Sequence, residues 1–269
     1  MRVIVTGGNS GVGAATAATL AAQGHSVVIA CRTIPKAERV AASIDGDVTV
    51  AQLDLADLAS VRKFADSVDG VDVLVNNAGV LGLPLTRTAD GFEAHMGTNY
   101  LGHFALTCLL CDRICDRVIS VVSSAYAVSR LHLDDLNWHN REYSTWLAYG
   151  ESKLAVMLFN HELTSRGVRN YMTDPGATNT DISRDASGIV PWIRDHTFRG
   201  FPAHSAQVGA RSTIQAVTTD LPSGTYLAPR FGQWGRPKVT KPRRKARDPA
   251  MARRLWDLSV ELTGCDWPV

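Results

Sequence analysis

The sequence lacks long hydrophobic runs and any strong charge imbalance, and both absences exclude classes of protein. No stretch approaches the roughly 18 consecutive apolar residues of a membrane-spanning helix. Met1-Arg2 leads directly into an apolar segment, so no signal peptide is expected. Lys and Arg number 28 against 26 Asp and Glu, a net charge of +2 that argues against a strongly basic nucleic-acid binder. We therefore expect a cytoplasmic protein with neither a nucleic-acid nor a membrane partner.

Cysteines are few and odd in number. Five in a chain without an export signal indicate reduced thiols rather than a disulfide framework. The spacing of Cys108, Cys111 and Cys115 suggests metal ligands, but apolar residues recur every three or four positions from Leu101 to Ile114. We expect these thiols to lie on one buried helical stripe and to bind no metal, with a reactive thiol as the alternative.

What the sequence does contain is a glycine-rich turn between an apolar strand and an alanine-rich helix. Such a turn brings backbone N–H groups and the positive end of the helix dipole close to a diphosphate. The spacing Gly7-x3-Gly11-x-Gly13 differs from the commoner G-x-G-x-x-G, and a glycine-rich turn without a ligand is the alternative. The turn predicts a dinucleotide site formed by Gly7, Asn9, Ser10, Gly11, Val12 and Gly13.

Apolar strands alternate with helical segments along the chain. This rhythm predicts one α/β domain with a doubly wound, mostly parallel sheet of about seven strands and helices on both faces. Ligands gather at the carboxyl ends of such strands. The expected strands are 2–6, 26–30, 48–52, 71–76, 117–123 and 169–173, and the expected helices are 11–23, 35–43, 58–68, 98–111 and 152–166.

Four further motifs follow the glycine turn in a fixed order. They are Asn76-Asn77-Ala78-Gly79, Val121-Val122-Ser123-Ser124, Tyr149-x3-Lys153 and Pro175-Gly176. In this order and spacing the set resembles the short-chain dehydrogenase/reductase family over nearly the whole chain. Three segments resemble its retinol-dehydrogenase-like branch: Ala30-Cys31-Arg32, Asn99 to Phe104 and Arg253 to Ser259. Asp174 departs from that branch, which commonly has histidine there.

The resemblance implies a single Rossmann domain over residues 1–269 and an NAD(P)-dependent oxidoreductase that interconverts a carbonyl and an alcohol. A dinucleotide sensor that has lost the reaction is the alternative, and a light-driven or C=C reductase is a lesser one. Family habit also implies a homodimer or homotetramer, although some members of the branch are monomeric.

Cofactor choice depends on the residues after the second strand. An NAD-selective site usually places a carboxylate there, whereas Arg32 can bind a 2′-phosphate, so NADP(H) is preferred over NAD(H). A solvated surface arginine is the alternative. Asp54 matches the position that contacts adenine in the family, or else caps the next helix, a role that Asp57 also suits. The resemblance assigns further cofactor contacts to Leu55, Asn76, Ala78, Gly79, Tyr149, Lys153, Pro175, Gly176, Thr178 and Thr180.

Tyr149 and Lys153 lie one turn apart on a helix, where the ammonium is expected to lower the pKa of the phenol. Tyr149 then acts as general acid and base during hydride transfer. The resemblance gives Ser124 the role of binding the substrate oxygen and gives Asn99 a carbonyl that holds a water linked to the lysine. Ser123 is expected to point to the other face of its strand, as a structural residue.

The remaining segments predict an apolar substrate and a peripheral C-terminus. Residues 177–205 are expected to form a lid, with aromatics that cover a bulky ketone, aldehyde or alcohol or simply pack on the core. Residues 236–247 are interpreted as a solvated basic linker, with a nucleic-acid or membrane-surface patch as the alternative. The linker leads to a terminal helix that starts after Asp248 and covers the pocket or a subunit interface, so that linker and helix together span 236–264. The expected pocket aromatics are Tyr126, Trp138, Tyr143 and Trp146, and the expected helix stripe is Met251, Leu255, Leu258 and Leu262.

Overall fold

A computed structural model describes residues 1–178 and 203–268. They form one Rossmann-like α/β domain whose eight-stranded sheet has the order β3-β2-β1-β4-β5-β6-β7-β8. All neighbours pair in parallel except β7 and β8, which are antiparallel. The strands are β1 Arg2–Thr6, β2 Ser26–Cys31, β3 Val48–Gln52, β4 Val71–Asn76, β5 Ile114–Val121, β6 Asn170–Thr173, β7 Thr225–Pro229 and β8 Pro237–Val239.

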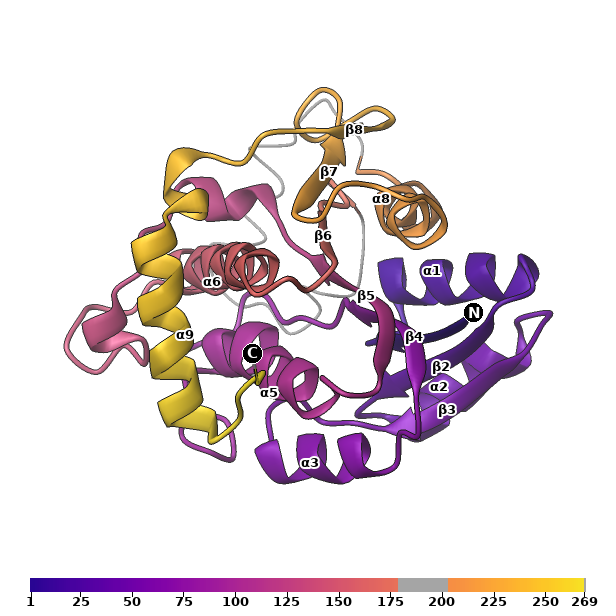
Figure 1. Cartoon of the computed structure of the whole chain (residues 1–269), viewed down its shortest axis with the longest axis horizontal. Coiled ribbons are helices and arrows are strands. Elements are labelled where there is room, and N and C mark those ends of the chain that lie inside the picture. The colour runs from indigo at the N-terminus through magenta and orange to yellow at the C-terminus, as the bar shows by residue number, and fades with distance from the viewer. Residues whose placement is uncertain (179–202, 269) are drawn as a thin grey trace.

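Side-chain alternation along the strands builds two cores. In β1, Val3 and Val5 belong to one core and Ile4 to the other, all fully buried. One core includes α1 (Gly11–Ala22), α2 (Ile34–Ala42) and α8 (Ala206–Thr218). The other includes α3 (Leu58–Asp66), α5 (Gly102–Leu109), α6 (Thr145–Ser165) and, outside α6, α9 (Pro249–Thr263), as Figure 1 shows. Among the described residues, no helix has the length and apolar character needed to cross a bilayer.

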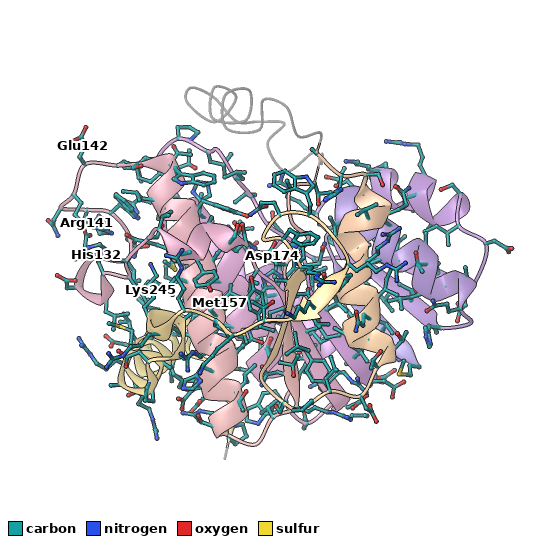
Figure 2. All side chains as sticks on the ribbon, turned by 90° about the horizontal axis from the view of Figure 1, so that it is seen from above. His132, Arg141, Glu142, Met157, Asp174 and Lys245 are labelled. Carbon is teal, nitrogen blue, oxygen red and sulfur yellow. The ribbon has the colours of Figure 1, made fainter. Side chains whose placement is uncertain are left out.

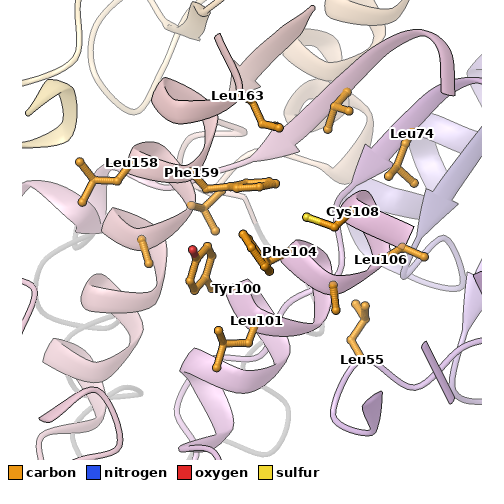
Figure 3. Packing of buried hydrophobic residues seen from close by; sticks show 14 of the residues in the cluster. Leu55, Leu74, Tyr100, Leu101, Phe104, Leu106, Cys108, Leu158, Phe159 and Leu163 are labelled. Carbon is orange, nitrogen blue, oxygen red and sulfur yellow. The ribbon is translucent and has the colours of Figure 1, made fainter. Parts of the chain in front are cut away.

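The larger core holds a group of aromatic rings (Figure 3). Trp256 of α9 stacks on Phe159 of α6 at 5.8 Å and meets Phe104 edge-on at 5.0 Å. The predicted stripe faces this core: Leu255 is fully buried, and Met251, Leu258 and Leu262 are partly buried against it. The helix therefore covers α6 rather than the pocket, and its buried side chains are Ala252, Leu255, Trp256, Ser259 and Thr263.

The basic stretch 236–247 is more ordered than the predicted solvated linker. It contains β8, the eighth strand, which adds an antiparallel edge to the sheet. Lys245 Nζ donates hydrogen bonds to Ala127 O at 2.8 Å and Ser129 O at 2.5 Å. Its basic side chains thus satisfy backbone carbonyls, a use that charge counting does not predict.

The three neighbouring cysteines do not share one helical stripe. Cys108 is buried in α5, whereas Cys111 lies in the turn after it and Cys115 is exposed in β5, which begins earlier than expected. Burial raises the pKa of the Cys108 thiol. Within residues 1–178 and 203–268, no cluster of His, Cys, Asp and Glu could hold a metal ion.

Candidate active site

A cavity of about 900 Å³ opens where the parallel strands end and the strand order reverses between β1 and β4. This is the position at which doubly wound sheets bind ligands. It is lined by most of the predicted residues, which come from seven separate segments. The predicted residues that line it are Gly7, Asn9, Ser10, Gly11, Val12, Gly13, Arg32, Asp54, Leu55, Ala78, Gly79, Ser124, Tyr149, Lys153, Pro175, Gly176 and Thr178.

The glycine turn has the shape of a diphosphate cradle. Gly7 has a φ of +66° and packs so closely that a Cβ there would lie 2.9 Å from Ala78 Cα. A Cβ on Gly13 would lie 2.5 Å from Gly7 O and would also clash with Asn77 Nδ2. Helix α1 begins at Gly11 without a side-chain cap on its N–H groups and without an acidic residue in its first turn. These groups suit an anion such as a dinucleotide diphosphate.

The Asn-Asn-Ala-Gly segment places its second asparagine, not its first, at the cavity. Asn76 is buried at the end of β4, donates to Thr107 Oγ1 at 3.0 Å and is absent from the cavity lining, contrary to the predicted contact. Its side chain points into the layer of α5. Asn77 lies beyond the strand, lines the cavity and donates to Thr6 O at 2.7 Å.

A buried histidine, given no catalytic role by the sequence, connects this segment to Asn99. Burial lowers the pKa of His103 to about 4, so the ring is neutral. Its Nδ1–H donates to Asn99 O at 3.1 Å, and Nε2 accepts from Thr6 Oγ1 at 2.9 Å. Thr6 Oγ1 in turn accepts the backbone N–H groups of Asn77 and Ala78. His103 is thus a buried residue with both ring nitrogens hydrogen-bonded, and it supports the site.

Asn99 lies behind the cavity in a π-helical turn, Gly97–Leu101. Its Oδ1 accepts from Val80 N at 2.7 Å, and its Nδ2 donates to Ser152 Oγ at 2.9 Å. A π-turn inside a helix often marks a functional position. Here the Asn99 side chain connects Val80, the residue after Gly79, to Ser152 of α6. The water-holding role of the Asn99 carbonyl stays a prediction.

Tyr149 and Lys153 share one face of α6, which begins at Thr145 and not at the predicted Ser152. Ser144 caps this helix by accepting from Leu147 N. Tyr149 and Lys153 are 6% and 3% exposed. The ammonium nitrogen lies 5.8 Å from the centre of the phenol ring.

The pKa of the phenol does not follow the expectation. Burial raises the pKa of Tyr149 to about 12, with a further increase from the charge of Asp174 and a partial decrease from a hydrogen bond with Ser123. Burial also lowers the pKa of Lys153 to about 8. Removal from water disfavours the charged form of each group. The proton is therefore held on Tyr149 at neutral pH.

Both serines face the cavity, although Ser123 was expected on the other face. The reason is that β5 ends at Val121, and Ser123 caps a 3₁₀ turn, Ser124–Ala127, where strand alternation no longer holds. Ser123 Oγ accepts from Ala125 N and is the hydrogen-bonding partner of Tyr149. Ser124 Oγ accepts from Gln233 Nε2 at 2.6 Å.

Asp174, the residue that departs from the branch, follows β6 directly and is 2% exposed; Figure 2 labels it near the centre of the molecule. Its Oδ1 accepts from Gly176 N at 2.8 Å and its Oδ2 from Tyr226 Oη at 3.2 Å. Burial raises the pKa of this carboxyl to about 6, opposed by these bonds, by the backbone N–H of Ser124 and by Lys153. A carboxylate here accepts a hydrogen bond from the backbone N–H of Ser124 and favours the charged form of Lys153.

The far end of the cavity contains Arg32 and Asp54. Arg32 is exposed just after β2 and lines the cavity. Asp54 lines it too and accepts from Ala56 N at 3.0 Å, while Asp57 caps α3 by accepting from Ala59 N at 2.9 Å. Thr178 Oγ1 donates to Pro175 O at 3.0 Å. Thr180 and most of the expected lid lie outside the described residues.

Of the four aromatics expected around the pocket, only Trp146 lines the cavity. Tyr143 instead donates to Glu93 Oε1 at 2.9 Å, and Glu93 also bonds His95 at 2.8 Å. The His95 ring meets Tyr149 edge-on at 6.3 Å. A buried carboxylate therefore anchors the segment before α6, which hydrophobicity alone did not indicate. Tyr126 and Trp138 are buried packing residues.

Comparisons with known proteins agree with this geometry. The family model described as short chain dehydrogenase matches residues 1–134. The chain is 39% identical over 290 residues to human retinol dehydrogenase 13, covering 99% of this chain and 85% of that protein. A structure of an uncharacterised protein from Mycobacterium paratuberculosis superimposes with a TM-score of 0.88 at 44% identity, covering 100% of this chain and 95% of that one. A short chain dehydrogenase from Burkholderia cenocepacia, in complex with NADP, gives 0.66 at 26% identity, covering 84% and 95%.

Proposed function

Because this chain belongs to the short-chain dehydrogenase family, in its retinol-dehydrogenase-like branch, and is therefore an oxidoreductase for a carbonyl/alcohol pair, we propose that it uses NADP(H) on a bulky apolar compound. The main support for an enzyme is that Tyr149, Lys153 and Ser124 line the same cavity as the glycine turn. A sensor would need the turn alone.

The residues divide the work of the reaction between them. The uncapped N–H groups at the start of α1 suit the diphosphate, and the bound nicotinamide supplies or accepts the hydride. Tyr149 donates its proton to the substrate oxygen in reduction and takes it back in oxidation. Ser124 hydrogen-bonds the same oxygen. The ammonium of Lys153 stabilises the phenolate that remains once the proton has left.

Two features support the finer assignments. Arg32 lines the cavity where an NAD-selective site would carry an acid, which favours a 2′-phosphate. The cavity wall is apolar at Val80, Leu81, Leu83, Val128 and Trp146, which favours an apolar substrate. The related retinol dehydrogenase and the NADP complex are consistent with both assignments.

The test is a turnover assay that follows NADPH absorbance with purified protein. Butanal, decanal and all-trans-retinal serve as probes of increasing apolar size, and each is repeated with NADH. We expect kcat/KM to rise with apolar size and to be higher with NADPH. Equal or better activity with NADH would contradict the cofactor proposal, and a preference for butanal would contradict the substrate proposal.

A further inference from the structure

The turn between β7 and β8 sends one polar side chain into the cavity. Gln233 lies in this turn, residues 230–236, and lines the cavity together with Ser124. Its Nε2 lies 2.6 Å from Ser124 Oγ. The two residues are 109 positions apart in sequence. None of the motifs identified in the sequence includes Gln233.

The backbone fixes the turn in this position. Arg230 N donates to Arg236 O at 3.1 Å, which closes the turn. Ala177 N donates to Gln233 O at 3.3 Å, and Gly176, with a φ of +69°, passes too close to that same oxygen to accommodate a side chain. The turn is thus attached to the segment after β6 that lines the cavity. Gln233 is held at the site by main-chain contacts.

Hydrogen-bond counting gives this contact a direction. A serine hydroxyl has one O–H donor and two lone pairs. Since the amide Nε2 can only donate, the Gln233 bond occupies a lone pair of Ser124 Oγ. Among residues 1–178 and 203–268, no side chain or backbone group accepts the Ser124 proton. That proton remains available to an oxygen in the cavity.

We propose that Gln233 is a positioning residue that orients the Ser124 hydroxyl as a hydrogen-bond donor toward the substrate oxygen. The proposal rests on the proposed function and adds a residue to that site. The backbone N–H of Ser124 is already held by the Asp174 carboxylate, so Gln233 fixes the remaining freedom, rotation of the hydroxyl. A fixed donor stabilises developing negative charge on a carbonyl oxygen better than a rotating one.

Two substitutions separate orientation from packing. Gln233→Met keeps the size and removes the donor, so the Ser124 proton stays available and kcat with decanal should fall only severalfold. Gln233→Glu places a carboxylate that accepts the Ser124 proton, so kcat should fall on the order of 10²-fold. Relative to the wild type at the same pH, that loss should be recovered as the pH is lowered and the new carboxyl becomes a donor. A packing role would give neither the difference nor the pH recovery.

The same substitutions in a Ser124→Ala background provide the decisive control. There Gln233→Glu and Gln233→Met should have the same kcat at every pH, because the hydroxyl is gone. NADPH affinity, followed by its fluorescence, should be unchanged throughout. A Gln233→Glu loss that persists in Ser124→Ala, or that equals the Gln233→Met loss at all pH values, would overturn the proposal.

A stability measurement keeps this test separate from that of the proposed function. The Gln233–Ser124 bond does not depend on the substrate, so the midpoints of urea unfolding of Gln233→Met, Ser124→Ala and the double variant should be non-additive. Additive midpoints would overturn the Gln233 proposal even in an active enzyme. A wild type that reduces none of the probes, with non-additive midpoints, would instead overturn the proposed function.

Discussion

Lys153 Nζ lies 5.8 Å from the centre of the Tyr149 ring and donates to Val121 O at 2.9 Å. The ammonium is thereby tied to the end of β5 while its charge faces the phenol from one helical turn away. Tyr149, the proposed general acid, thus lies on α6, and the ammonium beside it is held by both α6 and β5. Loss of either group should therefore change the chemistry more than the fold.

Tyr149→Phe removes only the phenol oxygen. Since the proposed mechanism transfers the proton of that oxygen, kcat should fall by roughly 10²- to 10⁴-fold. The affinity for NADPH, measured by fluorescence titration, should remain close to wild type because the ring is retained. Tyr143→Phe is the matched control, as its hydroxyl bonds Glu93 outside the cavity lining, and it should keep most of the turnover. Substantial turnover in Tyr149→Phe would remove this residue from the mechanism.

Arg32→Ala should affect NADPH and leave NADH largely unaffected. A charge-assisted hydrogen bond to the 2′-phosphate contributes about 1.5–3 kcal/mol, so KM for NADPH should rise roughly 10- to 100-fold. The measurement is KM for both nucleotides at fixed decanal. Arg39→Ala, an exposed arginine of α2 outside the cavity lining, is the control. An equal effect on both nucleotides would show that Arg32 does not read the phosphate.

The buried pair Asp174 and Lys153 should give turnover a bell-shaped pH profile. The pKa of Asp174 is raised to about 6 and that of Lys153 is lowered to about 8, so both are charged between these values. Turnover should fall below about pH 6 as the carboxylate is neutralised, and above about pH 8 as the ammonium is lost. In Asp174→Asn the acid limb should disappear. The alkaline limb should move to lower pH, because the Asp174 charge raises the pKa of Lys153. An unchanged profile would contradict the coupling.

The same carboxyl predicts a stability change of definite sign. Its folded pKa of about 6 exceeds the ordinary value of 3.8, so unfolding releases a proton between these values and stability falls as the pH rises through them. The free energy of unfolding of Asp174→Asn, relative to that of the wild type, should therefore increase from pH 4 to pH 7 by up to about 3 kcal/mol. Urea unfolding at both pH values measures this. The exposed Asp257→Asn should show no such trend.

Local sequence signals predicted the parts of the site that depend on neighbours in the chain. The glycine turn could be predicted from one strand-to-helix junction, and the Tyr149–Lys153 pair from one helix. The structure contains both elements. The alternating strands and helices predicted the parallel sheet for the same reason. These features are set by backbone geometry over a few residues.

The predictions that were wrong depended on where a strand ends or on distant partners. Ser123 was placed by strand alternation, which gives the wrong side because β5 stops at Val121. Asn76 was assigned by the family resemblance, but its side chain bonds Thr107 of α5. Gln233 reaches Ser124 only because β8 folds back on β7, and no local pattern encodes that contact. The pKa of Tyr149 followed burial, which the sequence does not quantify.

Gly13→Ala should strongly weaken dinucleotide binding by a steric clash. The new Cβ would lie 2.5 Å from Gly7 O and against Asn77 Nδ2, so the turn must open where the diphosphate is expected. We expect the NADPH dissociation constant to rise by at least about 100-fold, the loss of two or more hydrogen bonds from a charged group. Gly70→Ala is the matched control, since a Cβ there meets nothing within 4 Å and binding should be unaffected. Fluorescence titration gives both constants, and thermal unfolding checks that each variant is folded. Undiminished binding by a folded Gly13→Ala would mean that the dinucleotide does not lie on this turn.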